Sequence, residues 1–237
     1  MTARALAKPT PEHLAAEIRR GRWPTDDAFD RCLDGELQVM SACYWSQLAV
    51  AACAARWLRQ LGVDSVVDIG SGAGKFCVAA ALATRCQFFG LEQRSRLVAA
   101  ADELARSFGV ADRVRFARST FGEDPVPVAD VYYFYNSFGE NLFPYEDRLD
   151  LEVELSSHRF VACVAAAEEL LRCAPVGTHL LTYNGFGGRV PSSYTPIKGE
   201  RRLPCMLRMW KKTAELEHGE GELACPEPGI TLCQDQW

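Results

Sequence analysis

The sequence lacks the features that mark membrane, secreted and polyanion-binding chains. No stretch reaches the ~18 uncharged apolar residues of a membrane span, and the first residues carry no apolar signal-peptide core. The formal net charge of −5 argues against nucleic acid as the main partner, because Lys and Arg supply most of the affinity for phosphates. We therefore expect a cytoplasmic protein whose partners are neither membranes nor nucleic acid.

Clustered metal ligands are also missing. The four histidines are dispersed, and none of the ten cysteines has another at the short spacing of a zinc or redox site. We predict no metal site. Cys53, Cys77 and Cys163 lie among alanines and valines, which predicts small buried hydrophobic residues rather than nucleophiles.

What is present is an ordinary globular composition, with 48% hydrophobic and 24% charged residues in 237 positions. One domain is the default at this length. We expect N-terminal helices in residues 1–61, a core in residues 62–212 and an acidic tail in residues 213–237. The low apolar content of residues 219–237 predicts that they add little to stability.

The most informative stretch is residues 66–74, with the sequence Val-Val-Asp-Ile-Gly-Ser-Gly-Ala-Gly. A β-branched apolar run, a glycine-rich turn and a helix-compatible segment follow one another there. Glycines let the backbone turn sharply and lie close to a ligand, because a Cβ would fill the space that the ligand needs. The stretch predicts a nucleotide-binding corner between a buried strand and a helix.

The charges of this corner favour a cationic ligand. Asp68 at the strand end would repel a dinucleotide pyrophosphate, and Lys75 stands where the dinucleotide fingerprint has glycine. A phosphate-binding P-loop does not fit either, since Phe76 occupies the position of its Mg²⁺-binding Ser or Thr. A second carboxylate, Glu92, ends the next apolar run 22 positions after Gly70. That spacing is close to the ~20 expected for a residue that binds ribose hydroxyls.

The pattern Asp-x-Gly-x-Gly-x-Gly at residues 68–74 resembles the first motif of class I S-adenosylmethionine-dependent methyltransferases. S-adenosylmethionine carries an ammonium group and a sulfonium but no phosphate, in agreement with the charges. The resemblance extends over residues 41–212 and implies that S-adenosylmethionine is the cofactor. Residues of the motif and of the second strand end are then expected to contact it, namely Asp68, Gly70, Ser71, Gly72, Gly74, Glu92 and Gln93. The alternative for the two carboxylates is a helix cap and a solvated strand end.

The same resemblance implies cofactor contacts from two more segments. Tyr44, Trp45 and Ser46 lie where many members of the family have an aromatic residue and Thr-Pro that close over the methionine part. Ser46 departs from that pattern, and an aromatic core contact for Trp45 stays an alternative. Thr120 stands where the family has the Asp that accepts from the adenine amino group, and Phe121 is expected to stack on the adenine.

Strand-like and helix-like segments alternate after the glycine corner. Strands are expected near residues 86–92, 113–118, 129–135 and 178–183, with helices between them. Residues 194–198 and 203–211 are expected to pair around a turn at residues 199–202. We predict an α/β fold with a three-layer, doubly wound, mostly parallel sheet, an antiparallel last strand and N-terminal accessory helices.

The acceptor side is predicted from the end of the fourth strand, where Asn136-Ser137-Phe138 follows Tyr135. This run loosely resembles the Asn/Asp-Pro-Pro-Tyr/Phe element of amine methylases. The whole segment also resembles the Asn-Asn-Phe run of non-SET histone lysine methyltransferases, and a plain strand-end cap is the alternative. The candidate catalytic residues, which would orient the acceptor, are Tyr135, Asn136, Glu140 and Tyr183, with Asn136 also adjoining the cofactor.

The predicted function is methyl transfer from S-adenosylmethionine to an amine, in a protein lysine or another amino compound. Two alternatives are a methyltransferase of a metabolite with an oxygen, nitrogen or sulfur acceptor, and a non-catalytic cofactor-binding scaffold. The identity of the acceptor and the oligomeric state stay open at this point.

Overall fold

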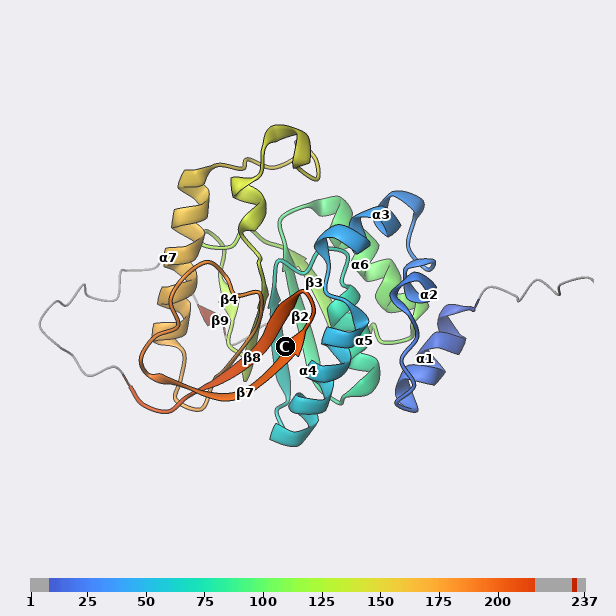
Figure 1. Ribbon diagram of the computed structural model, residues 1–237, viewed down its shortest axis with the longest axis horizontal. Helices are drawn as coiled ribbons and strands as arrows, with labels where there is room; N and C mark the ends of the chain where they lie inside the picture. The colour runs from blue at the N-terminus through green and yellow to red at the C-terminus, as the bar shows by residue number, and fades with distance from the viewer. Residues whose placement is uncertain (1–8, 216–231, 234–237) are drawn as a thin grey trace, which may run out of the picture.

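The computed structural model describes residues 9–215 and 232–233. The main sheet of residues 9–215 consists of β1 (Ser65–Ile69), β2 (Gln87–Glu92), β3 (Val114–Arg118), β5 (Val131–Tyr135), β6 (His179–Tyr183), β7 (Tyr194–Arg202) and β8 (Cys205–Lys212). Its seven strands have the order β3-β2-β1-β5-β6-β8-β7 (Figure 1). The first five in this order are parallel, and β8 is antiparallel to both of its neighbours. The predicted mostly parallel sheet with an antiparallel last strand is confirmed.

The helices form the two outer layers. In residues 9–215 they are α1 (Pro11–Arg19), α2 (Asp26–Asp30), α3 (Gly35–Tyr44), α4 (Leu48–Leu61), α5 (Lys75–Ala83), α6 (Ser95–Ser107) and α7 (Ser157–Cys173), with short 3-10 helices η1 (Gly139–Leu142) and η2 (Tyr145–Asp147). α4, α5 and α6 cover one face of the sheet and α7 covers the other, while α1 packs against α5 (Figure 1). The predicted three layers and N-terminal accessory helices are therefore present.

The central strands are buried on both faces, which explains their continuous apolar sequence. In β1, Val66 belongs to the core under α4 to α6, and the adjacent Val67 belongs to the core under α7. Both side chains are fully buried. This two-sided burial fixes the register of β1, since a slip by one residue would exchange the two faces and place Asp68 differently.

Within the region where N-terminal helices were expected, residues 35–61 form two of them. α3 ends at Tyr44 and α4 begins at Leu48, so residues 45–47 are not helical. Asp26 Oδ1 accepts a hydrogen bond from the backbone N–H of Leu48 at 2.9 Å, which satisfies one of the free donors at the start of α4. The break between these helices carries the Tyr44-Trp45-Ser46 segment across the carboxyl edge of the sheet.

The β7–β8 hairpin differs from the prediction. The turn was expected at residues 199–202, but β7 continues to Arg202 and the turn is at Leu203-Pro204. Gly199 and Glu200 read as turn residues, yet they pair with Arg208 and Leu207 in the ladder. β7 tolerates a charged run because it is an edge strand and most of its side chains are exposed or only partly buried.

Little of the predicted acidic tail is described. β4 (Val126–Pro127) pairs in parallel with β9 (Leu232–Cys233), and residues 216–231 and 234–237 lie outside the described residues. Within the described part, no helix has the length and apolar character needed to cross a membrane.

Candidate active site

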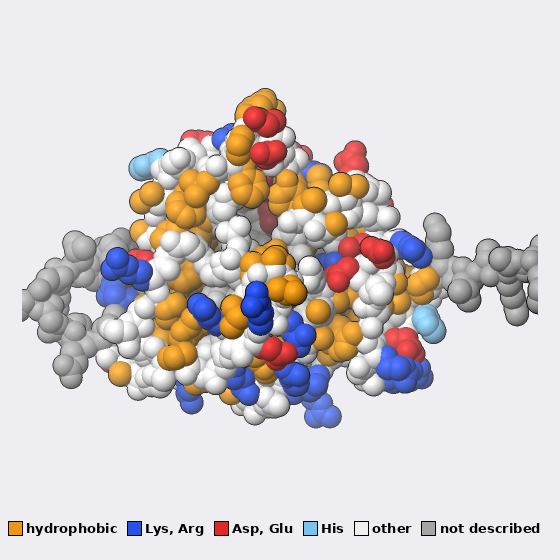
Figure 2. All heavy atoms as spheres, in the orientation of Figure 1, with side chains coloured by type: hydrophobic (Ala, Val, Ile, Leu, Met, Phe, Trp, Pro, Cys, Tyr) orange, Lys and Arg blue, Asp and Glu red, His pale blue; other side chains and the backbone are white. Residues whose placement is uncertain are grey.

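A cavity of about 200 Å³ lies at the carboxyl ends of β1, β2, β3 and β5. Parallel α/β sheets bind ligands at this edge. Figure 2 shows the surface hollowed there, below the uppermost segment of the view, with acidic side-chain atoms inside. Ten of the residues predicted from the sequence line it: Tyr44, Trp45, Gly70, Gly72, Glu92, Gln93, Phe121, Tyr135, Asn136 and Glu140.

The glycine loop is held against the end of β2. The backbone N–H groups of Gly70 and Ser71 both donate to the carbonyl of Leu91 at 2.9 Å. Gly72 has a φ of 56°, and a Cβ there would lie 2.5 Å from Trp45 Nε1. Glycine is therefore required at position 72 both for the left-handed backbone and for the close approach of the indole. Gly74 does not line the cavity; a Cβ on it would collide with the Phe116 ring, so its role is helix-to-sheet packing.

Glu92 presents a buried carboxylate to the cavity. Its Oε2 accepts from the backbone N–H of Gly72 at 3.1 Å, and its Oε1 accepts from that of Arg94 at 2.9 Å. Burial raises the pKa of Glu92, against the lowering effect of these two hydrogen bonds and of the Arg94 charge. Each carboxylate oxygen keeps a further lone pair, so Glu92 can still accept from two vicinal hydroxyls.

Asp68 lies in a separate small cavity of about 30 Å³, whose lining also includes the predicted residues Trp45, Ser46 and Ser71. The Cys77 thiol is 3.2 Å from Asp68 Oδ2. Burial, together with a smaller effect of the nearby Glu92 charge, raises the pKa of Asp68 to about 7, against the lowering effect of the Cys77 hydrogen bond. Asp68 was expected to contact the ligand, but it is not part of the lining of the main cavity, so that contact stays a prediction.

The N-terminal segment closes one side of the cavity. The Tyr44 hydroxyl donates to the carbonyl of Asp147 at 3.0 Å, and the Ser46 and Tyr133 hydroxyls are 2.6 Å apart. Trp45 is half-buried, packs against the core under α4 to α6 and covers Gly72. Trp45 therefore makes the core contact and also lines the cavity, and its contact with the cofactor stays a prediction.

The end of β3 contributes Ser119 and Phe121 but not Thr120. The backbone N–H of Thr120 donates to Asp124 Oδ2 at 2.6 Å, and Thr120 is not part of the cavity lining. Ser119 lines the cavity instead, and its buried hydroxyl has no hydrogen-bond partner among the described residues. Phe121 stacks on Phe138, with ring centroids 5.3 Å apart. The end of β3 thus offers the cavity a hydroxyl and an aromatic ring. The ring is that of the predicted Phe121, but the hydroxyl belongs to Ser119 and not to the predicted Thr120.

Asn136 occupies the predicted place after β5 and has a left-handed backbone, with φ 45°. Asparagine tolerates this region better than most residues. Its N–H donates to Gly185 and its carbonyl accepts from Gly139, at 3.0 and 2.9 Å. A Cβ on Gly139 would lie 2.5 Å from Asn136 Nδ2, so the side chain is packed against a glycine backbone. These contacts fix an exposed amide at the mouth of the cavity.

Two other predicted catalytic residues, Tyr183 and Glu140, are engaged in contacts within the protein. The Tyr183 hydroxyl donates to the carbonyl of Arg202 at 2.9 Å, and Tyr183 does not line the cavity. It packs against Tyr135, whose pKa is raised by burial and by the neighbouring phenol. Glu140 Oε1 accepts from Arg94 Nη2 at 2.8 Å and from the Leu149 N–H at 2.9 Å. Glu140 thus holds structure together at the rim.

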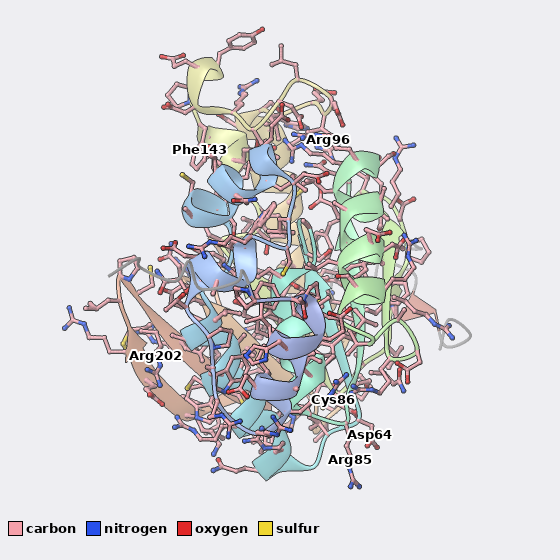
Figure 3. The ribbon with its side chains drawn as sticks, turned by 90° about the vertical axis from the view of Figure 1, so that its right-hand side faces the viewer. Asp64, Arg85, Cys86, Arg96, Phe143 and Arg202 are labelled. Atoms are coloured by element: carbon pink, nitrogen blue, oxygen red, sulfur yellow. The ribbon has the colours of Figure 1, made fainter. Side chains whose placement is uncertain are left out.

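The sequence analysis missed Arg94, which fastens the segment of residues 139–155 over the cavity. Its guanidinium is buried and also binds Asp150 at 2.9 Å, while Arg96 binds the same carboxylate at 2.7 Å. Figure 3 shows Arg96 and Phe143, one from α6 and one from this segment, at the same end of the molecule. The partners of Arg94 lie 46 and 56 positions away, so no local signal marks it. We call residues 139–155 the strap.

The described residues contain no group of three or more His, Cys, Asp or Glu side chains that could hold a metal ion. No family model and no curated protein matches the chain. Among solved structures, an RNA methyltransferase from Salinibacter ruber in complex with S-adenosyl-L-homocysteine is similar over 70% of this chain and 94% of its own. Its TM-score is 0.50 and its identity 21%.

A second similar structure is the mitomycin 7-O-methyltransferase MmcR, over 86% of this chain and 61% of its own, with TM-score 0.53 and 16% identity. The chain has the class I S-adenosylmethionine-dependent methyltransferase fold. At these identities the likeness concerns the fold. Neither structure is a histone lysine methyltransferase, so that loose resemblance gains no support from them.

Proposed function

We propose that this protein binds S-adenosylmethionine and transfers its methyl group to an amine, in a protein lysine or another amino compound. The observation that carries the proposal is Glu92: its buried carboxylate lies in the cavity beside the backbone of Gly72, with Phe121 on the same lining. Such a set suits vicinal ribose hydroxyls next to a stacked base.

The residues present fit the cofactor. The buried carboxylate of Glu92 lies at the edge where a cationic ligand would lie, and such a ligand would favour the ionised form of the nearby Asp68, whose pKa is about 7. The Ser119 hydroxyl, buried in the cavity without a partner among the described residues, can bind a polar ligand group. Glu92 and Gln93 would hold the ribose, Ser119 and Phe121 the base, and Gly70, Gly72, Tyr44 and Trp45 the methionine part.

Bound S-adenosylmethionine would supply a methyl group on a sulfonium, which is already a good leaving group. The protein then needs to align the acceptor and exclude water, and no nucleophilic side chain is required. The strap and the Tyr44-Trp45 segment cover the cavity from two sides and can exclude water. The side-chain carbonyl of Asn136, at the mouth of the cavity, can accept a hydrogen bond from the acceptor amine, and the lone pair of the amine nitrogen stays free.

The hydrogen bonding of the lining favours an amine over a hydroxyl acceptor. A hydroxyl acceptor needs a base. Glu92 is the residue proposed to bind the ribose, and Glu140 Oε1 is held by Arg94 and by the Leu149 N–H, so both carboxylates have another role in this proposal. Tyr135, with its raised pKa, stays a neutral phenol. An amine with a free lone pair needs orientation only, which Asn136 and Tyr135 can provide.

The first test is calorimetric titration with S-adenosyl-L-homocysteine, and no binding to the wild type would end the proposal. The second is S-adenosyl-L-homocysteine formation in a cell lysate separated into protein and small-molecule pools. Turnover on the protein pool, with the methyl on lysine, is expected. Turnover confined to the small-molecule pool would favour a metabolite methyltransferase, and cofactor binding without any turnover would favour a scaffold.

A further inference from the structure

A cluster of charged side chains lies behind the glycine loop, outside the main cavity. Its centre is Lys75, the first residue of α5, whose side chain is 2% exposed. The ammonium is 2.7 Å from Asp26 Oδ1, 2.8 Å from Asp30 Oδ1 and 2.9 Å from Ser41 Oγ. One ammonium thus joins α2, α3 and α5.

Two partners of Lys75 also hold the ends of the connection formed by residues 44–47. The backbone N–H of Trp45 donates to the carbonyl of Ser41 at 3.3 Å. The backbone N–H of Leu48 donates to Asp26 Oδ1 at 2.9 Å. The connection is therefore fixed at both ends to residues that bind Lys75, which itself follows Gly74 of the glycine loop.

This connection supplies the closing wall of the cavity. Tyr44 and Trp45 line the cavity, and the Trp45 indole lies against Gly72. The wall depends on charge pairing, since Asp30 is buried and a buried carboxylate without its partner is strongly unfavourable. Without the ammonium, Asp26 and Asp30 would gain by turning toward water, and α2 and the end of α3 would move with them.

We propose that Lys75 is a positioning residue for cofactor binding, because it ties both ends of residues 44–47 to the glycine loop and so keeps Trp45 over Gly72. The inference rests on the proposed function for the identity of the ligand. The order that Lys75 gives to residues 44–47 is a property of the protein without ligand, so it can be measured separately.

The test compares Lys75→Met with Lys212→Met. Lys212 is also fully buried, but it lies on β8 and donates to the carbonyls of Arg172 and Ala174, both at 2.6 Å. Both variants lose a buried ammonium, and only one loses the tie to the glycine loop. Affinity for S-adenosyl-L-homocysteine is measured by calorimetry, and hydrogen exchange of residues 41–48 without ligand by mass spectrometry, where circular dichroism shows each variant folded.

Lys75→Met is expected to bind S-adenosyl-L-homocysteine at least about tenfold more weakly than the wild type. A tenfold loss corresponds to residues 44–47 holding their wild-type position in only a tenth of the molecules. Lys75→Met is also expected to exchange faster over residues 41–48, whereas Lys212→Met changes neither quantity. Ser41→Ala and Asp26→Asn weaken single contacts of the cluster, and each should shift both readouts in the same direction by less. These two variants decide the matter if Lys75→Met does not fold.

The inference would be overturned if Lys75→Met, or both Ser41→Ala and Asp26→Asn, bound S-adenosyl-L-homocysteine with wild-type affinity, whatever the hydrogen exchange of these variants. An equal loss of affinity in Lys212→Met would also overturn it, because the effect would then be general destabilisation. If the wild type itself did not bind S-adenosyl-L-homocysteine, the proposed function would fail. The exchange comparison would still show whether Lys75 orders residues 44–47.

Discussion

The cofactor side of the cavity is held mainly by backbone groups, whereas the acceptor side is held by charged side chains. On the first side, the N–H groups of Gly70 and Ser71 bind the Leu91 carbonyl, and the Gly72 N–H binds Glu92. On the second, Arg94 fastens the strap through Glu140 and Asp150. Backbone contacts depend on a short local motif, while the ion pairs depend on residues far apart in the chain.

The difference teaches which substitutions should act on binding and which on turnover. On the cofactor side, substitutions that change the shape of the glycine loop or remove the Glu92 carboxylate should change the binding affinity, because backbone contacts already fix the geometry there. Substitutions on the acceptor side should change the rate, because in the proposed function its residues orient the acceptor. The predictions below are ordered from the largest expected effect to the smallest.

Gly72→Val should abolish measurable binding of S-adenosyl-L-homocysteine, a loss of ~100-fold or more. The new side chain would meet Trp45 Nε1 and adopt an unfavourable φ. Gly62→Val is the matched control: Gly62 has φ 66° with open space around it, so backbone strain alone is tested there. Retained binding in Gly72→Val, measured by calorimetry, would show that Trp45 can move away and that this side is not shape-determined.

Asn136→Ala should lower kcat by about ten- to a thousand-fold, ~1.4 to 4 kcal/mol of lost orientation, with cofactor affinity nearly unchanged. Asn184→Ala is the control, since Asn184 also follows a strand with positive φ but lies outside the main cavity. Single-turnover rate and melting temperature are measured on the same preparations. If both variants lost only stability, Asn136 would be a strand-end cap.

Glu92→Ala should weaken S-adenosyl-L-homocysteine binding by ~2 to 3 kcal/mol, the range for hydrogen bonds to a charged group. Glu140→Ala, on the acceptor side, should leave this affinity close to the wild-type value and lower the rate by loosening the strap. Calorimetry and turnover on both variants test the comparison directly. An equal loss of affinity in the two would mean that strap and glycine loop form one binding unit.

Stability without ligand should fall as pH rises toward neutrality, because Asp68 has a pKa of about 7 when folded against 3.8 as its ordinary value. Between those values the unfolded chain releases the proton first, which favours unfolding by up to ~1.4 kcal/mol per pH unit. Asp68→Asn should remove this part of the dependence. Denaturant unfolding at pH 5 and pH 8 checks it, and parallel curves for the two proteins would contradict it.

Truncation after His218 should have the smallest effect, a shift of the melting temperature by a few degrees or less, as expected for ~1 kcal/mol. Most of the removed residues lie outside the described part, and β9 pairs with β4 over two residues. Thermal unfolding of the full and truncated chains decides this. A drop of ten degrees or more would mean that the tail contributes to the core.

The sequence by itself determined the sheet and the glycine loop that lies beside Glu92. Local patterns carry that information: two-sided apolar runs define β1, β2 and β5, and glycine spacing defines the loop that Glu92 must face. Asn136 was also predictable, because the end of a parallel strand meets the binding edge and left-handed backbone favours asparagine there. These features depend on neighbours within a few positions or on general rules of parallel sheets.

Only the tertiary structure decided the pairs that join distant segments. Arg94 takes its partners from the strap, Lys75 takes its partners from α2 and α3, and Trp45 covers Gly72. The same packing placed Ser119 rather than Thr120 in the cavity, kept Tyr183 out of it and extended β7 to Arg202. A charged or polar residue can pair with many others of opposite charge, and only the folded arrangement selects which one it meets.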